Sequence, residues 1–598
     1  MSSRSAPVAV SQESMLWHER FAPGSFNLPC LVRRYEGPLD VPALRGALSE
    51  LVNRHEPLRS TFVIDGGAPR QVVRDPGLHD LPVLAVEDID IAAFLADASR
   101  RPFDLAEGPL FEPTLVRRGE NDHLLVIRLH HTVFDDWSVG PFRRELSALY
   151  TASLGRTAPA LPELTTTFSE YCREERAVLD GEAGAAQREW WRQELAGAPL
   201  SVQLPIGGDG PPQPGEPVTV NLPPDLAADV RALARRLRAT PFMTVLAAFT
   251  VLVARRTERD DVLIATVVAH RNRLDLEPLI GCFTKKVPLW VRLHGEPPFT
   301  EVVARTRAAL LGALEHQDVA FEAALDALAR PAAEHGVVPQ VSVVFQAETP
   351  PVAPLSLPGL KVDPYDVPVE ARQERHFAAG LRGPNAAAAR TERWGDGLYL
   401  GTFLILSLRD APEGMALIAR GVFDRPAGRR LVQEFVDLLT ELVAAPESTI
   451  PGASRPADDE MLDVLGFRVP RSSTEAALAT CPGVADVHVA VHDNRLVAYV
   501  VPDGPARPNL TELRQALWAR RPGALWPAAA ILGEQWAPAP PERAALDLAE
   551  RWSNVVGRER DVDDRYWQDF SFLRALDGIP DEAVVRNRTV RTLAAALG

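Results

Sequence analysis

Residues 123–153 read HLLVIRLHHTVFDDWSVGPFRRELSALYTAS and change character twice along their length. The first eight residues, 123–130, are dense in Leu, Val and Ile and predict a buried strand. A polar turn follows, and the residues from Ser138 onward have helical spacing, with Ser138 as the expected N-cap. The stretch therefore predicts a strand, a turn and a helix, with two adjacent histidines where the strand ends.

Similar alternation of strands and helices extends over about 450 residues of the chain and indicates layered α/β structure. The expected elements are a helix followed by a strand at 39–62, a helix pair at 223–257, a strand at 260–269, a strand at 337–346, a hairpin at 404–424 and a helix at 431–445.

The length and composition narrow the class of protein. A chain of 598 residues is too long for one hydrophobic core, so several domains are expected. A net charge of −16 with no basic stripe argues against nucleic acid or an anionic membrane as a partner. The sequence has no apolar run of about 18 residues, and its start lacks the apolar core of a signal peptide, so a cytoplasmic location is predicted.

The four cysteines are far apart and include no CxxC pair. This spacing favours small buried side chains over a disulfide framework or a zinc site.

The two histidines at the strand end allow two interpretations. A catalytic imidazole needs one nitrogen directed into a cleft and a second contact that holds the ring, and a strand end beside a tight turn provides both. Neighbouring side chains on a strand point to opposite sides, so only one of His130 and His131 serves a given cleft. The alternative is that both are polar residues at a strand end. A metal site is disfavoured, because the two rings diverge and no HExxH motif accompanies them.

HHTVFDDWS (130–138) resembles the HHxxxDGWS signature of condensation domains of nonribosomal peptide synthetases. The resemblance extends over about residues 7–450. Other segments resemble the family's motifs in the family's order: SQESMLW (11–17), RHEPLRSTF (54–62), REWWRQELAGAP (188–199), HRNRLDLEPLIGCF (270–283), HQDVAFE (316–322) and VVFQ (343–346).

The resemblance implies an α/β fold of two lobes of the chloramphenicol-acetyltransferase type in a V arrangement, at residues 1–175 and 176–450. It also implies a tunnel in which two carrier-bound substrates meet at the histidine turn. His131 is then the catalytic residue, acting as a base on the acceptor amine or hydroxyl or positioning that nucleophile. A neutral imidazole with a pKa of about 6.5 suits this role.

The resemblance also implies roles for residues around His131. The residues expected to be structural at the site are His130, Asp135, its predicted partner Arg271, Arg54 and Arg59. The residues expected to contact substrate are Asp136, Trp137, Ser138, Gly140, Lys285 and Gln346.

Two positions depart from the family pattern. Asp136 replaces the motif glycine, and its carboxylate could raise the pKa of His131 or repel an acidic substrate. In FTKKVPL (283–289), Lys285 and Lys286 replace the last two residues of the family's FVNT. These lysines form either a solvated patch or a site for an anionic substrate or phosphopantetheine.

The C-terminal part resembles pieces of two other domains. Residues 457–536 resemble the small lid subdomain of an adenylation domain, but APAPPERAAL (537–546) lacks the catalytic lysine, so no adenylation is expected. Residues 544–598 resemble a degenerate helical carrier domain. Leu573 stands where the modified serine belongs, and a two-residue slip places Ser571 there without the motif glycines.

Three functions are consistent with these features. The favoured one is an acyltransferase that forms an amide or an ester, with acyl or peptidyl carrier proteins acting in trans and an acceptor that is a small molecule or carrier-bound. The chain itself is expected to bind no cofactor and no metal, since 4'-phosphopantetheine is delivered on the partner carriers. The alternatives are a catalytically silent scaffold that docks carrier proteins and, with less support, an epimerase.

Overall fold

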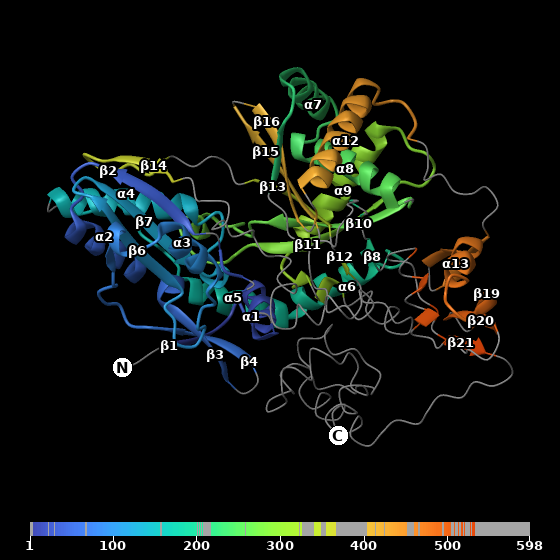
Figure 1. The fold of residues 1–598 in the computed structure, drawn as a ribbon, viewed down its shortest axis with the longest axis horizontal. Helices are drawn as coiled ribbons and strands as arrows, with labels where there is room; N and C mark the ends of the chain where they lie inside the picture. Colours follow the sequence, from blue (N-terminus) through green and yellow to red (C-terminus); the bar gives the residue numbers. More distant parts are fainter. Residues whose placement is uncertain are drawn as a thin grey trace. The chain divides into compact units, whose positions relative to one another are not determined.

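In the computed structural model of the chain, the predicted strand–turn–helix unit forms strand β7, a short 3-10 turn η3 and helix α4 (Figure 1). β7 spans Asp122–Leu129 and is the central strand of a five-stranded sheet ordered β14-β2-β7-β6-β5. The turn η3 spans His131–Val133, and α4 spans Val139–Gly155. The histidine pair therefore lies at the C-terminal end of a central strand, as predicted.

The structure describes residues 4–206, 217–325, 340–348, 354–365, 404–450, 460–503 and parts of 508–532, apart from short gaps inside these ranges.

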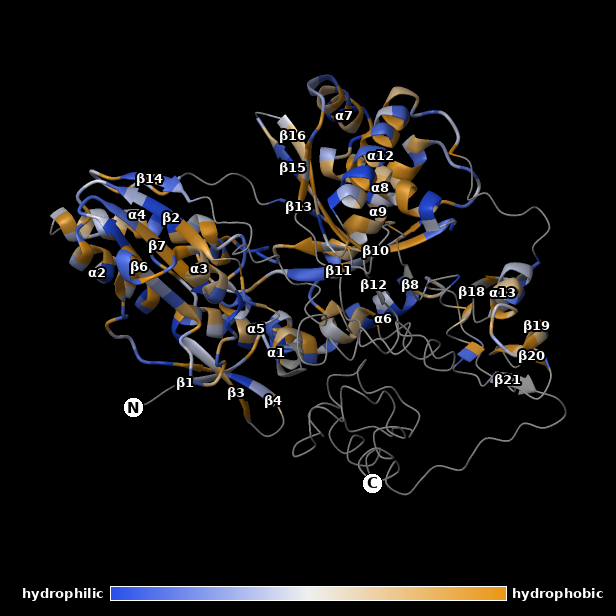
Figure 2. Cartoon of the chain, viewed as in Figure 1, coloured by the Kyte–Doolittle hydropathy of each residue, from blue (hydrophilic) through white to orange (hydrophobic). Residues whose placement is uncertain are grey.

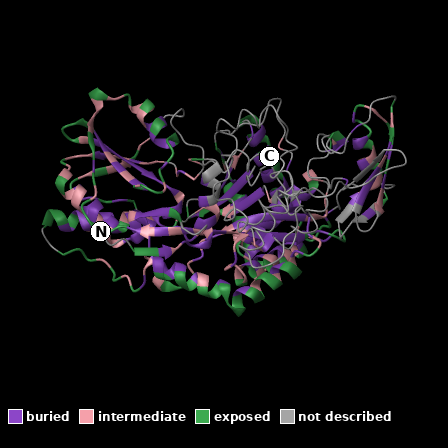
Figure 3. Ribbon diagram, turned by 90° about the horizontal axis from the view of Figure 1, so that it is seen from below, coloured by how far each residue is buried: buried purple, intermediate pink, exposed green. Residues whose placement is uncertain are grey.

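Helices cover both faces of the five-stranded sheet, which explains why β7 is buried along nearly its whole length. Side chains alternate between the two faces of a strand. Leu125 and Ile127 pack in one core cluster with helix α2 (Val41–Arg54) and α4. Val126 packs on the opposite face with helix α3 (Ile91–Arg100). The strands of the sheets are mostly buried, and the outer helix faces are exposed (Figure 3).

The chain divides into two compact units, and the first is assembled from Met1–Gly184, Ala269–Lys285 and Thr349–Ala379. Its other strands in the five-stranded sheet are β2 (Leu31–Glu36), β5 (Val83–Ala85), β6 (Phe111–Gly119) and β14 (Lys361–Pro364). A separate sheet, ordered β1-β4-β3, contains β1 (Arg4–Pro7), β3 (Ser60–Asp65) and β4 (Ala68–Val73). Its other helices are α1 (Val10–Phe21), η1 (Glu56–Arg59), η2 (Val86–Asp88), α5 (Phe168–Asp180) and η4 (Leu274–Leu276).

The predicted lobe boundary between residues 175 and 176 differs from this division. That boundary falls inside α5, which continues to Asp180 as one helix. In addition, two later segments return to the first unit: β14 pairs antiparallel with β2, and residues 269–285 pack beside the histidine turn. Local patterning could not show this return, because the pairing joins residues more than 300 positions apart.

The second unit contains a six-stranded sheet ordered β11-β10-β13-β15-β16-β9. Its strands are β9 (Val218–Asn221), β10 (Asp261–Val268), β11 (Lys285–Arg292), β13 (Val343–Ala347), β15 (Leu404–Ala411) and β16 (Gly414–Gly421). A two-stranded sheet pairs β8 (Ser201–Val202) with β12 (Gln340–Val341). The helices are α6 (Glu182–Glu194), which leads into this unit, α7 (Pro224–Arg236), α8 (Pro241–Thr257), α9 (Phe299–Glu315) and α12 (Arg425–Ala444).

The core of the second unit is centred on α8. This helix is buried continuously from Met243 to Ala254, which explains its almost uninterrupted apolar sequence. Phe249 contacts the rings of Phe345 on β13 and Phe435 on α12. β10 is drawn almost entirely as hydrophobic in Figure 2. The helices and strands predicted at 223–257, 260–269, 404–424 and 431–445 are present, and the α/β class is confirmed. The strand predicted at 337–346 corresponds to β12 and β13, and its first three residues lie outside the described residues.

A small α/β arrangement follows within the predicted 457–536 range. A hairpin of β17 (Met461–Val464) and β18 (Phe467–Pro470) precedes α13 (Arg471–Leu478). A sheet ordered β19-β20-β21 comprises Val484–His492, Arg495–Pro502 and Ala529–Leu532. Residues 537–546 and the predicted carrier-like segment 544–598, with Ser571 and Leu573, lie outside the described residues.

No single helix in the described ranges is long and apolar enough to cross a membrane. The neighbouring helices α7 and α8 reach the length and apolar composition of a membrane span only when taken together, and the angle between them is 103°. In the same part of the chain, no three His, Cys, Asp or Glu side chains gather closely enough to hold a metal ion.

Phe249→Ala should destabilise the second unit by about 3–5 kcal/mol, because it leaves a cavity where three rings meet. Leu311→Ala is the control, since Leu311 is 38% exposed on α9, and it should cost less than about 0.5 kcal/mol. Hydrogen exchange of the α8 amides measures both changes within this unit. Equal protection of α8 in the two variants would contradict its central place in the core.

Candidate active site

His130 is fully buried at the end of β7, and its ring is held from several sides. Its Nδ1 accepts a hydrogen bond from the Thr132 backbone N–H at 3.3 Å and lies 2.7 Å from the Thr132 hydroxyl. Its Nε2 lies 3.4 Å from a carboxylate oxygen of Glu19, and Phe103 packs edge-on against the ring. These contacts leave His130 inside the protein, where it supports the turn.

His131 is half-buried, and the turn fixes its tautomer. Its Nδ1 lies 2.9 Å from the carbonyl oxygen of Phe134. A carbonyl only accepts hydrogen bonds, so Nδ1 carries the proton and Nε2 is the basic nitrogen. The His131 backbone N–H donates to Phe26 O at 2.8 Å, which holds the first residue of η3 in place. A ring oriented in this way is suited to accept a proton at Nε2.

Helix α1, which carries the SQESMLW motif, supports the same turn. Gln12 Nε2 donates to the carbonyl of Thr132 at 2.7 Å, and Gln12 Oε1 accepts from the Ala9 N–H at 2.8 Å. The neighbouring Ser11 hydroxyl donates to Cys282 O at 3.2 Å. The N-terminal motif therefore braces both the turn and the segment 269–285.

Asp135 is fully buried and accepts hydrogen bonds on both carboxylate oxygens. Oδ1 accepts from the Ser138 N–H at 2.9 Å and the Ser138 hydroxyl at 2.7 Å. Oδ2 accepts from the Phe283 N–H at 3.0 Å. Arg271 Nη2 lies 3.2 Å and 3.3 Å from the two oxygens, so the ion pair predicted from the sequence is present. All of these contacts join Asp135 to other buried groups of the protein, which supports a structural role for Asp135.

The guanidinium of Arg271 is almost as buried as its partner, with 1% of the side chain exposed. Its Nη1 donates to the carbonyls of Leu276 and Leu279 at 2.6 Å and 2.8 Å, and its Cζ lies 4.0 Å from the centroid of the Phe283 ring. Burial lowers the pKa of this guanidinium, and Asp135 acts in the opposite direction. Arg271 thus shapes the segment 269–285 around the buried carboxylate.

Ser138 lies at the N-cap position of α4, as predicted, but its burial differs from the predicted substrate contact. Its side chain is fully buried, and its hydroxyl lies between Asp135 and Gly281, at 3.1 Å from the Gly281 carbonyl and the Gly281 N–H. Its carbonyl oxygen accepts the Phe142 N–H at 3.0 Å, as that of an N-cap residue does, while its hydroxyl cannot bind the third helical residue, because Pro141 has no N–H. Gly140, another predicted substrate contact, is also buried in the first turn of α4.

Asp136 and Trp137 are the predicted substrate contacts of this turn that reach the surface. Asp136 is half-buried, and 36% of Trp137 is exposed. Positive φ among the described non-glycine residues occurs at Arg238, His270 and Glu296. Asp136 therefore replaces the motif glycine without adopting a left-handed backbone.

The RHEPLRSTF motif forms a second buried support, of which the sequence prediction identified only part. Arg54 Nε and His55 Nε2 lie 3.1 Å and 2.8 Å from the same oxygen of Glu145, which is fully buried on α4. His55 Nδ1 accepts from the Ile280 N–H at 3.2 Å. The sequence prediction included Arg54 but missed His55 and Glu145. The sequence contained little indication of this contact, because a Glu on a helix usually faces solvent and a His in a motif usually contacts residues near it in sequence.

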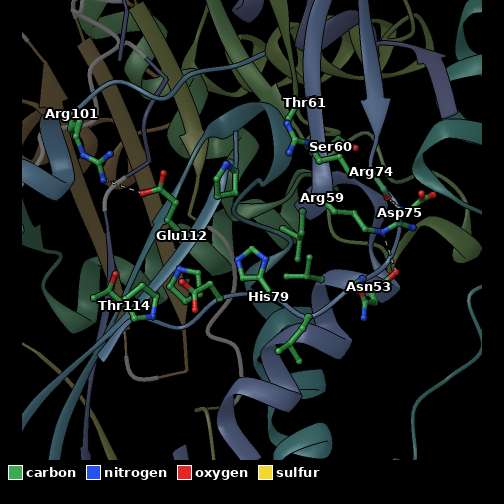
Figure 4. Close-up of a pocket in the computed structure, with 18 residues that line it drawn as sticks. Asn53, Arg59, Ser60, Thr61, Arg74, Asp75, His79, Arg101, Glu112 and Thr114 are labelled. Atoms are coloured by element: carbon green, nitrogen blue, oxygen red, sulfur yellow. Dashed lines mark hydrogen bonds and ion pairs between the residues drawn. The ribbon is translucent and has the colours of Figure 1, made fainter. Parts of the chain in front are cut away.

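Arg59 belongs to a different feature of the first unit, a cavity of about 510 Å³ (Figure 4). Its guanidinium donates to the carbonyls of Asn53 and Arg74. Figure 4 shows His79 in the middle of the cavity, with Glu112 on the side opposite Arg59. No residue of the histidine turn lines this cavity.

Lys285 does not lie at the surface, where the predicted contact with substrate would place it. Its side chain is 3% exposed, and its ammonium lies 2.7 Å from Glu175 Oε1 on α5. Its charge is therefore compensated inside the first unit. Gln346 belongs to the second unit, where its amide donates to the Ser407 hydroxyl at 3.2 Å.

A family model of the condensation domain matches residues 2–374 of the chain. The match covers the histidine turn and all the motif residues that support it. The chain therefore belongs to the condensation-domain family, and the resemblance to condensation domains of nonribosomal peptide synthetases is confirmed.

A curated relative is similar to more than half of the chain. Malpinin synthetase of Mortierella alpina is 35% identical over 355 residues, which are 58% of this chain and 4% of that protein. The chain thus spans a small fraction of this curated relative.

Solved structures support the fold. The X-domain in its complex with OxyB from teicoplanin biosynthesis is 26% identical, with a TM-score of 0.63 over 77% of this chain and 98% of that chain. The condensation domain of the monacolin K polyketide synthase MokA has a TM-score of 0.59 at 20% identity, over 75% of this chain and 100% of that chain. The predicted chloramphenicol-acetyltransferase type of fold is thereby confirmed.

Asp135→Ala should destabilise the first unit by about 3–5 kcal/mol, because it leaves the Arg271 guanidinium buried without its carboxylate. Asp275→Ala is the control. The Asp275 side chain is 28% exposed beside Arg273, and its loss should cost at most about 1 kcal/mol. Urea unfolding followed by hydrogen exchange of the β7 amides measures both changes. An equal decrease in the free energy of unfolding in the two variants would show that the buried Asp135–Arg271 pair stabilises the first unit no more than the exposed pair does.

The pH dependence of stability should report the buried Glu175 carboxylate. Burial by itself raises the pKa of this group, but Lys285 and the Val10 N–H outweigh burial and hold the pKa below its ordinary value. A lowered folded pKa stabilises the protein above the unfolded pKa of about 4.3, and this contribution is lost as the pH falls through the folded pKa.

Glu175→Gln should therefore lower the free energy of unfolding most at neutral pH, and the gap to the wild type should narrow below about pH 4.3. Urea titrations at a series of pH values measure this gap. A gap that stays constant over the acid range would contradict the direction of the pKa shift.

Proposed function

We propose that the protein is a condensation enzyme that transfers a carrier-bound acyl or aminoacyl group to an amine or hydroxyl acceptor. The observation that carries this proposal is the orientation of His131, whose Nδ1 is bound to the Phe134 carbonyl. This contact supports Nε2 of His131 as the proton acceptor. The buried Asp135–Arg271 pair holds the turn that presents this nitrogen.

In the proposed reaction, His131 Nε2 accepts a proton from the acceptor as its nitrogen or oxygen attacks the thioester carbonyl carbon. A carbon–nitrogen or carbon–oxygen bond forms, and the carbon–sulfur bond breaks. The proton passes from the imidazolium to the thiolate that leaves on the carrier's phosphopantetheine. General-base help of this kind contributes about 10²–10⁴-fold, and holding both reactants together adds to the rate.

The proposal includes carrier proteins as partners in trans. Its support is the order of segments in the sequence. The lid-like segment 457–536 follows the condensation domain directly, which leaves no room between them for a large nucleotide-binding subdomain. In this proposal the substrates arrive as carrier-bound thioesters. The cytoplasmic location predicted from the sequence is part of the same proposal.

A docking scaffold is the second candidate function. One similar structure, the X-domain, was solved in complex with OxyB, and this chain is 26% identical to it. Asp136 in place of the motif glycine favours the same alternative, because it adds a carboxylate beside the histidine turn. In this case the protein would bind carrier proteins without changing their acyl groups.

His131→Ala should reduce transfer by about 10²–10⁴-fold, because it removes the base and leaves the buried supports of the turn in place. The assay mixes the full chain with acyl-loaded carrier proteins and candidate amines and alcohols. Intact-protein mass spectrometry then follows the loss of the acyl mass and the matching product.

His130→Ala is the comparison, and it should lower the melting temperature, because the ring is fully buried. Undiminished transfer by His131→Ala would refute the base assignment. Loaded carriers that stay intact with wild-type protein but co-elute with it would favour the scaffold.

A further inference from the structure

A single buried carboxylate, that of Glu175, connects the segments that surround the histidine turn. Glu175 lies on α5, and its side chain is 3% exposed. Its Oε2 accepts from the Val10 N–H at 2.8 Å, at the first residue of α1. Its Oε1 accepts from the Tyr171 hydroxyl at 2.8 Å and lies 2.7 Å from Lys285 Nζ.

The carboxylate reaches both ends of the segment 270–285. Lys285 at the C-terminal end is bound directly. His270 at the N-terminal end is bound through Tyr171, whose oxygen lies 2.9 Å from His270 Nδ1. Because the Tyr171 proton is donated to Glu175, the Nδ1–H of His270 is the donor in this second bond. His270 also adopts a φ of 49°, an uncommon conformation for a non-glycine residue and a sharp change of chain direction.

The residues between these two ends hold the catalytic turn. Arg271 follows His270 directly and pairs with Asp135. Phe283, two residues before Lys285, donates its backbone N–H to the same carboxylate at 3.0 Å. A shift at either end of the segment therefore displaces a donor to Asp135.

Helix α1 connects Glu175 to the turn by a second route. The Val10 N–H that binds Glu175 begins this helix, and Gln12 in its first turn donates to Thr132 O. Glu175 thus anchors α1 and both ends of the segment 270–285.

We propose that Glu175 is a positioning residue for His131, with Lys285 as the charge partner that holds its carboxylate in place. This inference rests on the proposed function, because it concerns the same histidine. Lys285 stands where the FVNT pattern has Asn, so the ion pair is a substitute that this chain builds at that position.

The physical reason is the cost of an uncompensated buried charge. Removing one partner of a buried ion pair takes away the compensation of the other, and the surrounding segments move to reach water. Lys285 and Phe283 are close neighbours on one segment, so movement of the lysine alters the donors to Asp135. A displacement of about 1 Å at a catalytic group can reduce a rate by about 10²-fold.

The test compares three variants of the full chain at a temperature where circular dichroism shows all of them folded. Glu175→Gln should lower kcat by about 10²-fold with little change in the acceptor KM, because it removes the carboxylate that Lys285 binds and misplaces the turn. Glu174→Gln is the matched control. Glu174 is the next residue on α5 and also binds the segment 270–285, through Arg273, but its side chain is 54% exposed. The control should keep the wild-type kcat.

The third variant combines Glu175→Gln with Lys285→Asn, which removes both charges and keeps groups able to form hydrogen bonds with Val10 and Tyr171. It should recover most of the lost kcat. A purely stabilising role for Glu175 would lower the melting temperature and leave kcat unchanged in the folded variants, and that result would overturn the proposal. Failure of the double variant to recover activity would overturn the role assigned to Lys285.

A second readout separates this inference from the proposed function. The rate of diethyl pyrocarbonate modification at His131, followed by peptide mass spectrometry, requires no catalysis. Misplacement of the turn should make His131 react faster in Glu175→Gln than in the wild type and in Glu174→Gln. If the wild type transfers no acyl group, the proposed function fails and the modification rates still test the positioning. Equal rates in all variants would refute it.

Discussion

The buried carboxylate of Asp135 sets the constraint on which the first unit depends. An ionised carboxylate away from water must be compensated by a cation and by hydrogen-bond donors. Asp135 obtains them from Ser138, close by in sequence, and from Arg271 and Phe283, more than 130 residues further along. A segment from the middle of the chain must therefore return to the N-terminal sheet. This return fixes the turn that presents His131.

The same arrangement recurs around the site with other acidic residues. Glu19 receives the N–H groups of Gly24 and Phe26, while Glu145 binds His55 and Arg54. Glu145 joins segments that are distant in sequence, and Glu19 organises its own neighbours and also lies 3.4 Å from His130 Nε2. Buried hydrogen-bonded charges contribute less net stability than apolar packing, but they tolerate few alternative arrangements. The histidine turn is thus specified mainly by polar contacts, on an apolar sheet that supplies the stability.

The sequence was sufficient for the elements and for part of the site. The apolar run at β7 and the helical spacing at α8 depend on local patterning, which a single sequence displays. The pairing of Asp135 with Arg271 came from motif resemblance. The burial of Ser138 and Lys285 could not be predicted, because it depends on Gly281 and Glu175, which lie more than 100 residues away. For this reason Ser138 was predicted to contact substrate, although its hydroxyl is buried and binds Asp135 and Gly281.

One consequence concerns the order in which the chain is made. Strand β14 at Lys361–Pro364 completes the edge of the sheet that begins at β2, and residues 269–285 compensate Asp135. Domains generally fold as units while the chain emerges from the ribosome. Here α7, α8, α9 and strands β9 to β13 of the second unit are synthesised before β14, the last strand of the first unit's sheet. In the N-terminal part of the protein, Asp135 lacks its later partners until about residue 283 has been synthesised, and the edge of the sheet at β2 stays open until about residue 364. The first unit therefore completes its fold late, and neither unit corresponds to a continuous stretch of the gene.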